Sequence, residues 1–186
     1  ARAAIARKIE MRRQTESYQD RERRRQVAAV AFESARLTLE RLKISMKPDG
    51  PQLESTEAIV EEAIRKAPDL AQGYDIRGML RQMRGDLDSA IADFTEALRL
   101  DPGYAEARLH RASAYDRKGD GAAARADCDY ALERNPGSGS AYQLRARLRM
   151  RAGDTKGAIA DFDEAIRIHP ANAIARVHRA SAKLSL

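Results

Sequence analysis

The feature that most constrains the fold of this sequence is a constant interval between its prolines. Four of the six prolines lie 34 residues apart: Pro68, Pro102, Pro136 and Pro170. Three glycines, each followed by aspartate, keep the same period: Gly85, Gly119 and Gly153. This period indicates a stack of small repeated units, because a unit this short cannot bury an apolar face without a neighbour.

Small side chains recur with the same period. Alignment on the prolines gives three full units and a partial one: 71–104, 105–138, 139–172 and 173–186. Three columns hold glycine or alanine: Gly78, Ala112, Ala146 and Ala180; Ala90, Ala124 and Ala158; Ala97, Ala131 and Ala165. A bulkier column holds Phe94, Cys128 and Phe162. Small residues at fixed positions let the axes of neighbouring helices approach closely.

Turn chemistry divides each unit into two helices. Glycine readily takes the left-handed conformation that ends a helix, and the aspartate after it can cap the next helix. The second helix of each unit stops before a proline, because the residue that precedes proline disfavours the helical conformation. We therefore expect each unit to form two antiparallel helices of roughly 13–14 residues.

These features resemble the tetratricopeptide repeat family. Its pattern is an aromatic residue, Leu-Gly, Tyr, an alanine with an aromatic four residues later, and a proline. The first and third units match at Tyr74, Gly78, Ala90, Phe94, Ala97 and Pro102, and at Tyr142, Ala146, Ala158, Phe162, Ala165 and Pro170. The middle unit keeps Tyr115 but has Arg108 and Cys128 in place of the two aromatics. The resemblance covers 71–186 and implies an all-α fold, a right-handed α-solenoid of antiparallel helix pairs.

The first 70 residues carry a degenerate unit behind a basic segment. Residues 51–70 show the columns of a second helix, and its first helix is expected within 26–46. One apolar face of that first helix is predicted to hold Val27, Ala31, Ala35, Leu39, Leu42 and Met46. No proline or glycine interrupts residues 1–47, so we expect a long basic N-terminal helical segment that includes this first helix.

An arginine column stands where the family usually has leucine. It holds Arg77, Arg111, Arg145 and Arg179, and three aspartates recur just before the bulky column: Asp93, Asp127 and Asp161. An arginine at the edge of a packed face buries its stem and needs an anion for its head. We expect a structural Arg–Asp ladder within or between units. Three residues that replace the family's tyrosine are expected to be solvated or paired with acids: Arg81, Arg149 and Lys183.

The sequence shows no catalytic constellation, phosphate-binding loop or metal motif. The one cysteine, Cys128, stands in a column of phenylalanines, so we interpret it as a small core residue rather than a nucleophile. His110 and His178 recur with the repeat, which favours a surface or partner contact over proton transfer. We therefore expect no enzymatic activity, no cofactor and no metal.

The resemblance implies that a partner binds on the concave face, which the first helix of each unit lines. A helical wheel places that face opposite the small column. Its residues are Gln72, Asp75, Ile76, Met79, Met83, Glu106, Leu109, His110, Ser113, Arg117, Ser140, Gln143, Leu144, Arg147, Arg151, Ile174, Val177 and His178. This mixture fits an extended or helical peptide of mixed charge with apolar anchors, and hence a protein-binding adaptor. The alternative is a solvated face with the partner bound elsewhere.

Some members of the family clamp an acidic C-terminal peptide with lysine and asparagine on this face. The equivalent positions here hold Asp75, Met79, His110, Ser140 and Leu144. Because neither lysine nor asparagine stands at these positions, we expect no binding to the C-terminal tails of chaperones.

Charge leaves further partner classes open. The formal net charge is +6, and residues 1–50 hold 13 basic against 7 acidic residues, so the whole excess lies there. The balanced region 51–186 gives no reason to expect a nucleic-acid partner. Residues 1–25 leave open a docking arm for another copy, contact with an acidic membrane surface, or contact with nucleic acid.

A second function class is a self-assembling structural protein, a homo-oligomer. The last helix has no covering helix in the sequence, which leaves Val177, Ala180 and Leu184 uncovered, and the N-terminal arm could dock on another copy. No signal peptide is visible and the chain starts at Ala1 without a methionine, so its compartment stays open.

Overall fold

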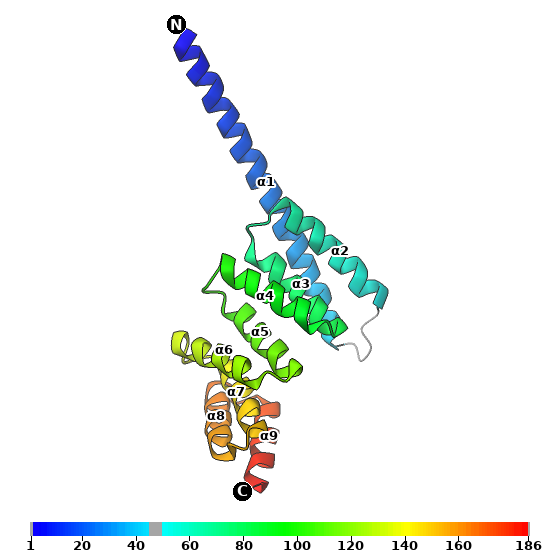
Figure 1. Ribbon diagram of the computed structural model, residues 1–186, viewed down its shortest axis with the longest axis vertical. Coiled ribbons are helices and arrows are strands. Elements are labelled where there is room, and N and C mark those ends of the chain that lie inside the picture. Colours follow the sequence, from blue (N-terminus) through cyan, green and yellow to red (C-terminus); the bar gives the residue numbers. More distant parts are fainter. Residues whose placement is uncertain (1, 45–49, 186) are drawn as a thin grey trace.

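The computed structural model describes residues 2–44 and 50–185. Over these residues the chain is a series of helices joined by short turns, with no strand, which confirms the predicted all-α class (Figure 1). The helices are α1 (Arg2–Ile44), α2 (Gly50–Lys66), α3 (Ala71–Arg84), α4 (Leu87–Leu100), α5 (Ala105–Lys118), α6 (Gly121–Arg134), α7 (Gly139–Arg151), α8 (Thr155–Ile168) and α9 (Ala173–Leu184).

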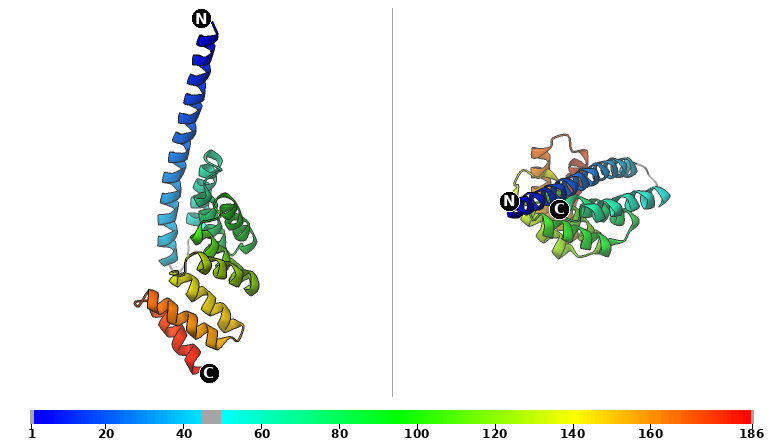
Figure 2. Two further views of the ribbon diagram at one scale, coloured as in Figure 1. Left: turned by 90° about the vertical axis from the view of Figure 1, so that its left-hand side faces the viewer. Right: turned by 90° about the horizontal axis from the view of Figure 1, so that it is seen from above.

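The helices stack as an α-solenoid. Each pair α3–α4, α5–α6 and α7–α8 forms a hairpin, and the second helix of each pair packs on the first helix of the next. In Figures 1 and 2 the hairpins succeed one another along the long axis of the molecule down to α9. The first helices also touch one another in the order α1, α3, α5 and α7, and so form one continuous row.

The turns inside the hairpins have the predicted chemistry. Gly85, Gly119 and Gly153 take φ values of 89°, 92° and 82°, the left-handed region in which a side chain is strained. The aspartate after each glycine then caps the following helix, and in the first hairpin the Asp86 carboxylate accepts a hydrogen bond of 3.2 Å from the backbone N–H of Ser89. The predicted Gly-Asp turns are confirmed.

The core follows the columns of the repeat. The bulky residue on each second helix packs against the residue 16 positions later on the next first helix. Phe94 lies 5.7 Å from the ring of His110, and Phe162 lies 5.9 Å from that of His178. In the middle unit the smaller Cys128 is fully buried in a cluster with Leu144. This pairing explains why histidine recurs in the chain.

Close packing of this kind relies on glycine at two places on α3. A Cβ atom at Gly78 would lie 2.6 Å from the ring of Phe94, and one at Gly73 would lie 2.5 Å from the ring of Phe32. Each aromatic ring therefore rests directly on the backbone of α3.

The second half of α1 packs as the first helix of an additional hairpin with α2. Its buried apolar residues are Ala28, Phe32, Ala35, Leu39 and Leu42. The prediction that Val27 belongs to this face is wrong, because Val27 is 52% exposed. The buried face is centred on Ala28 and Phe32, and the Phe32 ring reaches α3. Val27 directly precedes Ala28 and is rotated about 100° from it around the helix, so its side chain points away from this face. Met46 lies outside the described residues.

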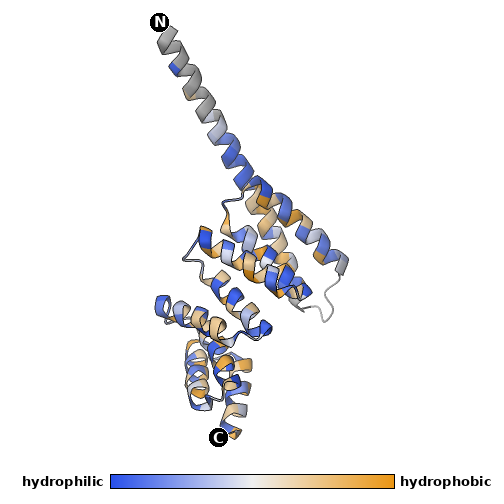
Figure 3. Cartoon of the chain, viewed as in Figure 1, coloured by the Kyte–Doolittle hydropathy of each residue, from blue (hydrophilic) through white to orange (hydrophobic). Residues whose placement is uncertain are grey.

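The first half of α1 projects away from the stack. Figures 1 and 2 show it extending beyond every other helix, and Figure 3 shows polar residues along its part nearest the stack. Met11 and Tyr18 are 68% and 66% exposed, and Arg25 is 3.6 Å from Asp69 where the helix reaches the stack. None of the helices, over residues 2–44 and 50–185, has the length and apolarity needed to cross a bilayer.

Candidate functional site

The predicted Arg–Asp ladder is present and holds each hairpin together. The guanidinium of each first helix donates two hydrogen bonds to the aspartate 16 residues later, at distances of 2.7–3.0 Å, in three pairs: Arg77–Asp93, Arg111–Asp127 and Arg145–Asp161. The carboxylates are buried, whereas the arginines stay partly exposed. Bidentate pairs of this geometry fix the register of the two helices.

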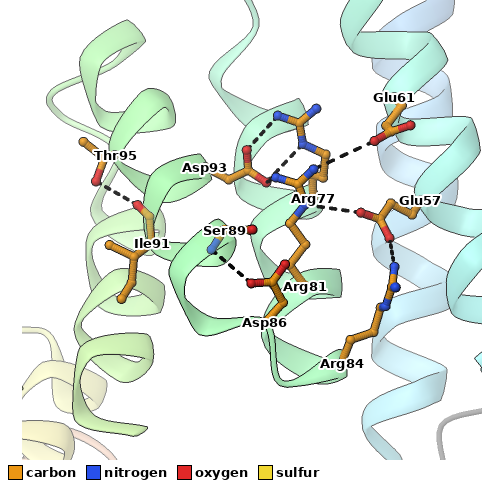
Figure 4. A network of polar contacts seen from close by, with 10 residues as sticks. All are labelled: Glu57, Glu61, Arg77, Arg81, Arg84, Asp86, Ser89, Ile91, Asp93 and Thr95. Carbon is orange, nitrogen blue, oxygen red and sulfur yellow. Dashed lines mark hydrogen bonds and ion pairs between the residues drawn. The ribbon is translucent and has the colours of Figure 1, made fainter. Parts of the chain in front are cut away.

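A second arginine supplements each pair. Asp93 also accepts a 2.8 Å hydrogen bond from Arg81, whose guanidinium extends to Glu57 on α2 (Figure 4). Arg149 lies 3.0 Å from Asp161 in the same way. Of the two alternatives predicted for Arg81 and Arg149, solvation or pairing with acids, the structure shows pairing.

The middle unit is built differently. Tyr115 occupies the column of Arg81 and Arg149, and the second arginine comes instead from Arg108, at 3.5 Å from Asp127. The ladder also reaches back to the preceding unit, where Arg145 meets Asp129 at 2.7 Å. The equivalent partner of Arg111 is the hydroxyl of Thr95, at 3.1 Å, so the middle unit has fewer carboxylates around its arginines.

Two adjoining pockets follow the row of first helices. One has a volume of about 500 Å³ and is lined by Phe32, Glu33, Arg36 and Glu40 of α1, by Gln72, Asp75, Ile76 and Met79 of α3, and by Tyr104, Glu106 and His110. The other has a volume of about 380 Å³ and is lined by Glu106, Leu109, His110 and Ser113 of α5, and by Ser140, Gln143, Leu144 and Arg147 of α7. Glu106 and His110 line both, so the two pockets form one groove.

The groove brings together most of the residues that the helical wheel placed on the concave face. Six of those residues line neither pocket: Met83, Arg117, Arg151, Ile174, Val177 and His178. On α9, Ile174 and Val177 are 59% and 66% exposed, whereas His178 stacks on Phe162. Met79 and Leu144 are each only 8% exposed, so they form the floor of the groove rather than its rim.

Sequence reasoning missed one wall of the groove. Four residues of α1 and the residue before α5 line it: Phe32, Glu33, Arg36, Glu40 and Tyr104. Counting back by one period does not find the α1 residues, because the connection between α1 and α2 is longer than the Gly-Asp turns of the later hairpins. The sequence does contain one indication of this wall: the side of α1 next to its apolar face carries two glutamates, Glu33 and Glu40.

A buried polar cluster underlies the junction of the two pockets. Asp75 is 3% exposed, and its carboxylate accepts hydrogen bonds from His110 Nδ1 at 2.8 Å and from the Tyr104 hydroxyl at 3.3 Å. Burial, together with the charge of Asp75, raises the pKa of Tyr104 above its ordinary value. Because both oxygens of Asp75 are engaged, this carboxylate positions His110 and is not free for a ligand.

Charge is unequal between the ends of the groove. Near α1 the lining residues Glu33, Glu40 and Glu106 are acidic, with Arg36 paired to Glu33 at 2.8 Å. Toward α7, the buried carboxylate of Asp116 is paired with Arg151 and lies 3.4 Å from Arg147, and the exposed Arg117 donates a 2.6 Å hydrogen bond to the Gln82 carbonyl. Two arginines, Arg147 and Arg151, thus share a single carboxylate at this end.

Comparison with solved structures finds tetratricopeptide proteins. The first such domain of Spaghetti (RPAP3), in complex with the HSP90 peptide SRMEEVD, is 26% identical with a TM-score of 0.60, over 62% of this chain and 91% of that one. TTC0263 of Thermus thermophilus is 21% identical with a TM-score of 0.70, over 84% of this chain and 81% of that one. The Arabidopsis OM64 domain is 24% identical with a TM-score of 0.61, over 63% and 98%.

Among curated proteins, no relative matches the sequence. The sequence profile of the tetratricopeptide repeat does match, at residues 77–139 and 144–185, which is more than half of the chain. Proteins with this repeat generally act as non-catalytic interaction scaffolds. With the 34-residue period, the Gly-Asp turns and the stacked hairpins, the match establishes that this chain belongs to the tetratricopeptide repeat family.

Proposed function

We propose that this chain is a non-catalytic adaptor that holds a segment of a partner protein in the groove along α1, α3, α5 and α7. The observation that carries the proposal is the pair of adjoining pockets, of about 500 and 380 Å³, with Glu106 and His110 common to both. A continuous groove of this length suits a polypeptide segment better than a single small molecule.

The chemistry of the groove supports one kind of partner segment. Its floor is apolar, with Ile76, Met79 and Leu144 almost fully buried, so the segment presents apolar side chains inward. The acidic walls near α1 favour a basic residue at one end of the segment, and Arg147 favours an acidic residue at the other. Charge complementarity of this kind sets the direction in which a segment lies.

An acidic chaperone tail does not fit this description. The RPAP3 domain is in complex with the peptide SRMEEVD, and we predict that this chain does not bind it. The pocket near α1 places Glu106 and Glu40 where an acidic peptide would have to lie. Fluorescence anisotropy with labelled SRMEEVD should show no saturation at micromolar concentrations of the chain, and a micromolar complex would overturn the prediction.

The proposal is tested with a peptide selected from a random library on the whole chain. Glu106→Arg reverses the charge of an exposed residue that lines both pockets. We expect this substitution to lower the affinity of the chain for the selected peptide by at least about tenfold. The matched control is Glu54→Arg on α2, an exposed acid that lines neither pocket. Equal binding by the wild type and Glu106→Arg would reject the groove as the binding surface.

Self-assembly is a second candidate, favoured by apolar side chains exposed at both ends of the stack. At one end Val30 and Leu37 of α1 are 72% and 60% exposed, and at the other end Val177 and Leu184 of α9 are 66% and 90% exposed. Contact between unlike ends of two copies would be head-to-tail. Light scattering across a dilution series tests this: the candidate requires a mass that rises with concentration and falls in Val177→Glu.

A further inference from the structure

Three positions of the middle unit depart together from its two sister units. Arg108 stands in a column of tyrosine (Tyr74 and Tyr142), and Tyr130 stands in a column of glutamate (Glu96 and Glu164). The third departure is Arg134, in a column of leucine and isoleucine. The middle unit thus has its tyrosine on the second helix instead of the first, and it has two arginines that the sister units lack at these positions.

The three side chains meet on α5 and α6. The guanidinium carbon of Arg108 lies 3.7 Å from the centroid of the Tyr130 ring, and that of Arg134 lies 5.3 Å from it. The Arg108 side chain is only 14% exposed, which holds its guanidinium against the ring. A pocket of about 210 Å³ opens beside them, and its remaining lining is compact: Pro102, Gly103, Ala105, Ala131 and Asn135. We call this the Tyr130 pocket.

The Tyr130 pocket lacks carboxylates. Asp127, the one acid that Arg108 meets, lies 3.5 Å away and already accepts two hydrogen bonds of 2.7 and 2.8 Å from Arg111. Within residues 2–44 and 50–185 no carboxylate pairs with Arg134, and no acidic residue lines the pocket. A further carboxylate is absent nearby in the described part of the chain, because Arg111 meets the hydroxyl of Thr95, whereas Arg145 of the third unit meets Asp129 at the equivalent position.

The sister units show what a balanced surface looks like at this place. There the glutamate of the Tyr130 column pairs with an arginine three residues later, at 2.7–2.8 Å for Glu96–Arg99 and at 2.8 Å for Glu164–Arg167. In the middle unit Tyr130 and Glu133 stand in these two columns, so this pair is absent, and two arginines lie beside an aromatic ring instead.

We propose that the Tyr130 pocket binds a carboxylate carried on a flat aromatic group. The carboxylate lies between Arg108 and Arg134 and gives Arg134 a paired anion, and the aromatic body packs on the apolar lining. Pockets for drug-sized ligands measure about 300–1,000 Å³, so this smaller pocket suits one aromatic acid. That acid is either free or the C-terminal phenylalanine or tyrosine of a polypeptide. The pocket shares no lining residue with the concave groove.

The test is an NMR titration of the ¹⁵N-labelled whole chain with phenylacetate. We expect saturable shifts confined to the amides of Gly103, Ala105, Ala131 and Asn135 and their neighbours. Arg134→Gln, at an exposed position, should weaken binding about tenfold. Arg167→Gln removes one positive charge from the sister unit and should leave the affinity unchanged. The neutral phenylacetamide should not bind.

Three results overturn the proposal: equal affinity in Arg134→Gln and the wild type, equal affinity for phenylacetamide, or equal affinity for inorganic phosphate, which has no aromatic body. The source of the acid is decided by a second pair of probes. Tighter binding of N-acetyl-phenylalanine than of phenylacetate assigns the pocket to the C-terminus of a polypeptide, and the reverse assigns it to a free aromatic acid.

Discussion

At the scale of single residues, the position of Cys128 in the repeat explains why its thiol should be unreactive. Burial in the cluster with Leu144 raises the pKa of its thiol to about 12, with the charge of Asp127 adding to the effect. The thiolate is the reactive form, so the folded chain has almost none at neutral pH. We predict that Ellman's reagent at pH 8 leaves the folded chain unmodified and titrates one thiol in denaturant. Rapid reaction of the folded chain would contradict this.

The ladder allows a matched pair of substitutions at the same scale. Asp161 is buried and serves both Arg145 and Arg149, so Asp161→Asn leaves two guanidinium groups with a weaker partner. We expect the free energy of unfolding, measured with urea, to fall by about 2 kcal/mol. This loss is smaller than the cost of breaking a fully buried pair, because both arginines are partly exposed to water. Asp163→Asn breaks the half-exposed pair with Arg179 and should cost less than about 1 kcal/mol. Equal losses would argue against a structural ladder.

At the scale of elements, helix caps connect stability to pH. Hydrogen bonds from the side chain and the backbone N–H of Ser89 lower the pKa of Asp86. A carboxyl group with a lowered folded pKa stabilises the chain above its unfolded pKa of about 3.9, and this contribution is lost as the pH falls through the folded value. Between pH 5 and pH 2 the urea midpoint should therefore fall less steeply in Asp86→Asn, which keeps a capping side chain. Identical pH profiles would contradict this.

The projecting part of α1 is an element with few partners. This part of the helix projects from the stack and residues 17–24 are exposed, so deleting residues 2–21 should leave the melting temperature unchanged. The same deletion tests the electrostatic alternatives. If residues 1–25 contact membranes or nucleic acid, the full chain should bind anionic vesicles or DNA in a salt-dependent way and the deleted chain should not. Binding that persists after the deletion would exclude the arm as its cause.

Elements whose structure depends on local chemistry could be predicted from the sequence. The Gly-Asp turns, the capping aspartates and the ladder pairs each depend on residue types at fixed spacings, and all three were predicted correctly. The apolar face of α1 was harder, because no repeated column fixes its rotation. Val27 was predicted inside and Phe32 was overlooked, since only the packing of Phe32 on Gly73 sets that rotation.

At the scale of the whole molecule, the groove could be predicted in direction but not in depth. A helical wheel says which way Met79 and Leu144 point, but only the neighbouring helices show that both are almost fully buried. The wall that α1 contributes could not be predicted from the repeat, because the α1–α2 connection breaks the 34-residue count. The Tyr130 pocket likewise depends on residues of two helices that meet only in the folded hairpin.

The central claim is that the row of first helices, with α1 as one wall, is the surface that holds a partner. Backbone hydrogen exchange of the whole chain, with and without the selected peptide, tests it most directly. We predict that the peptide slows exchange in α3, α5, α7 and residues 28–44 of α1, and leaves α2, α4 and α6 unchanged. Protection confined to α2, α4 and α6, or to residues 2–25, would contradict the account.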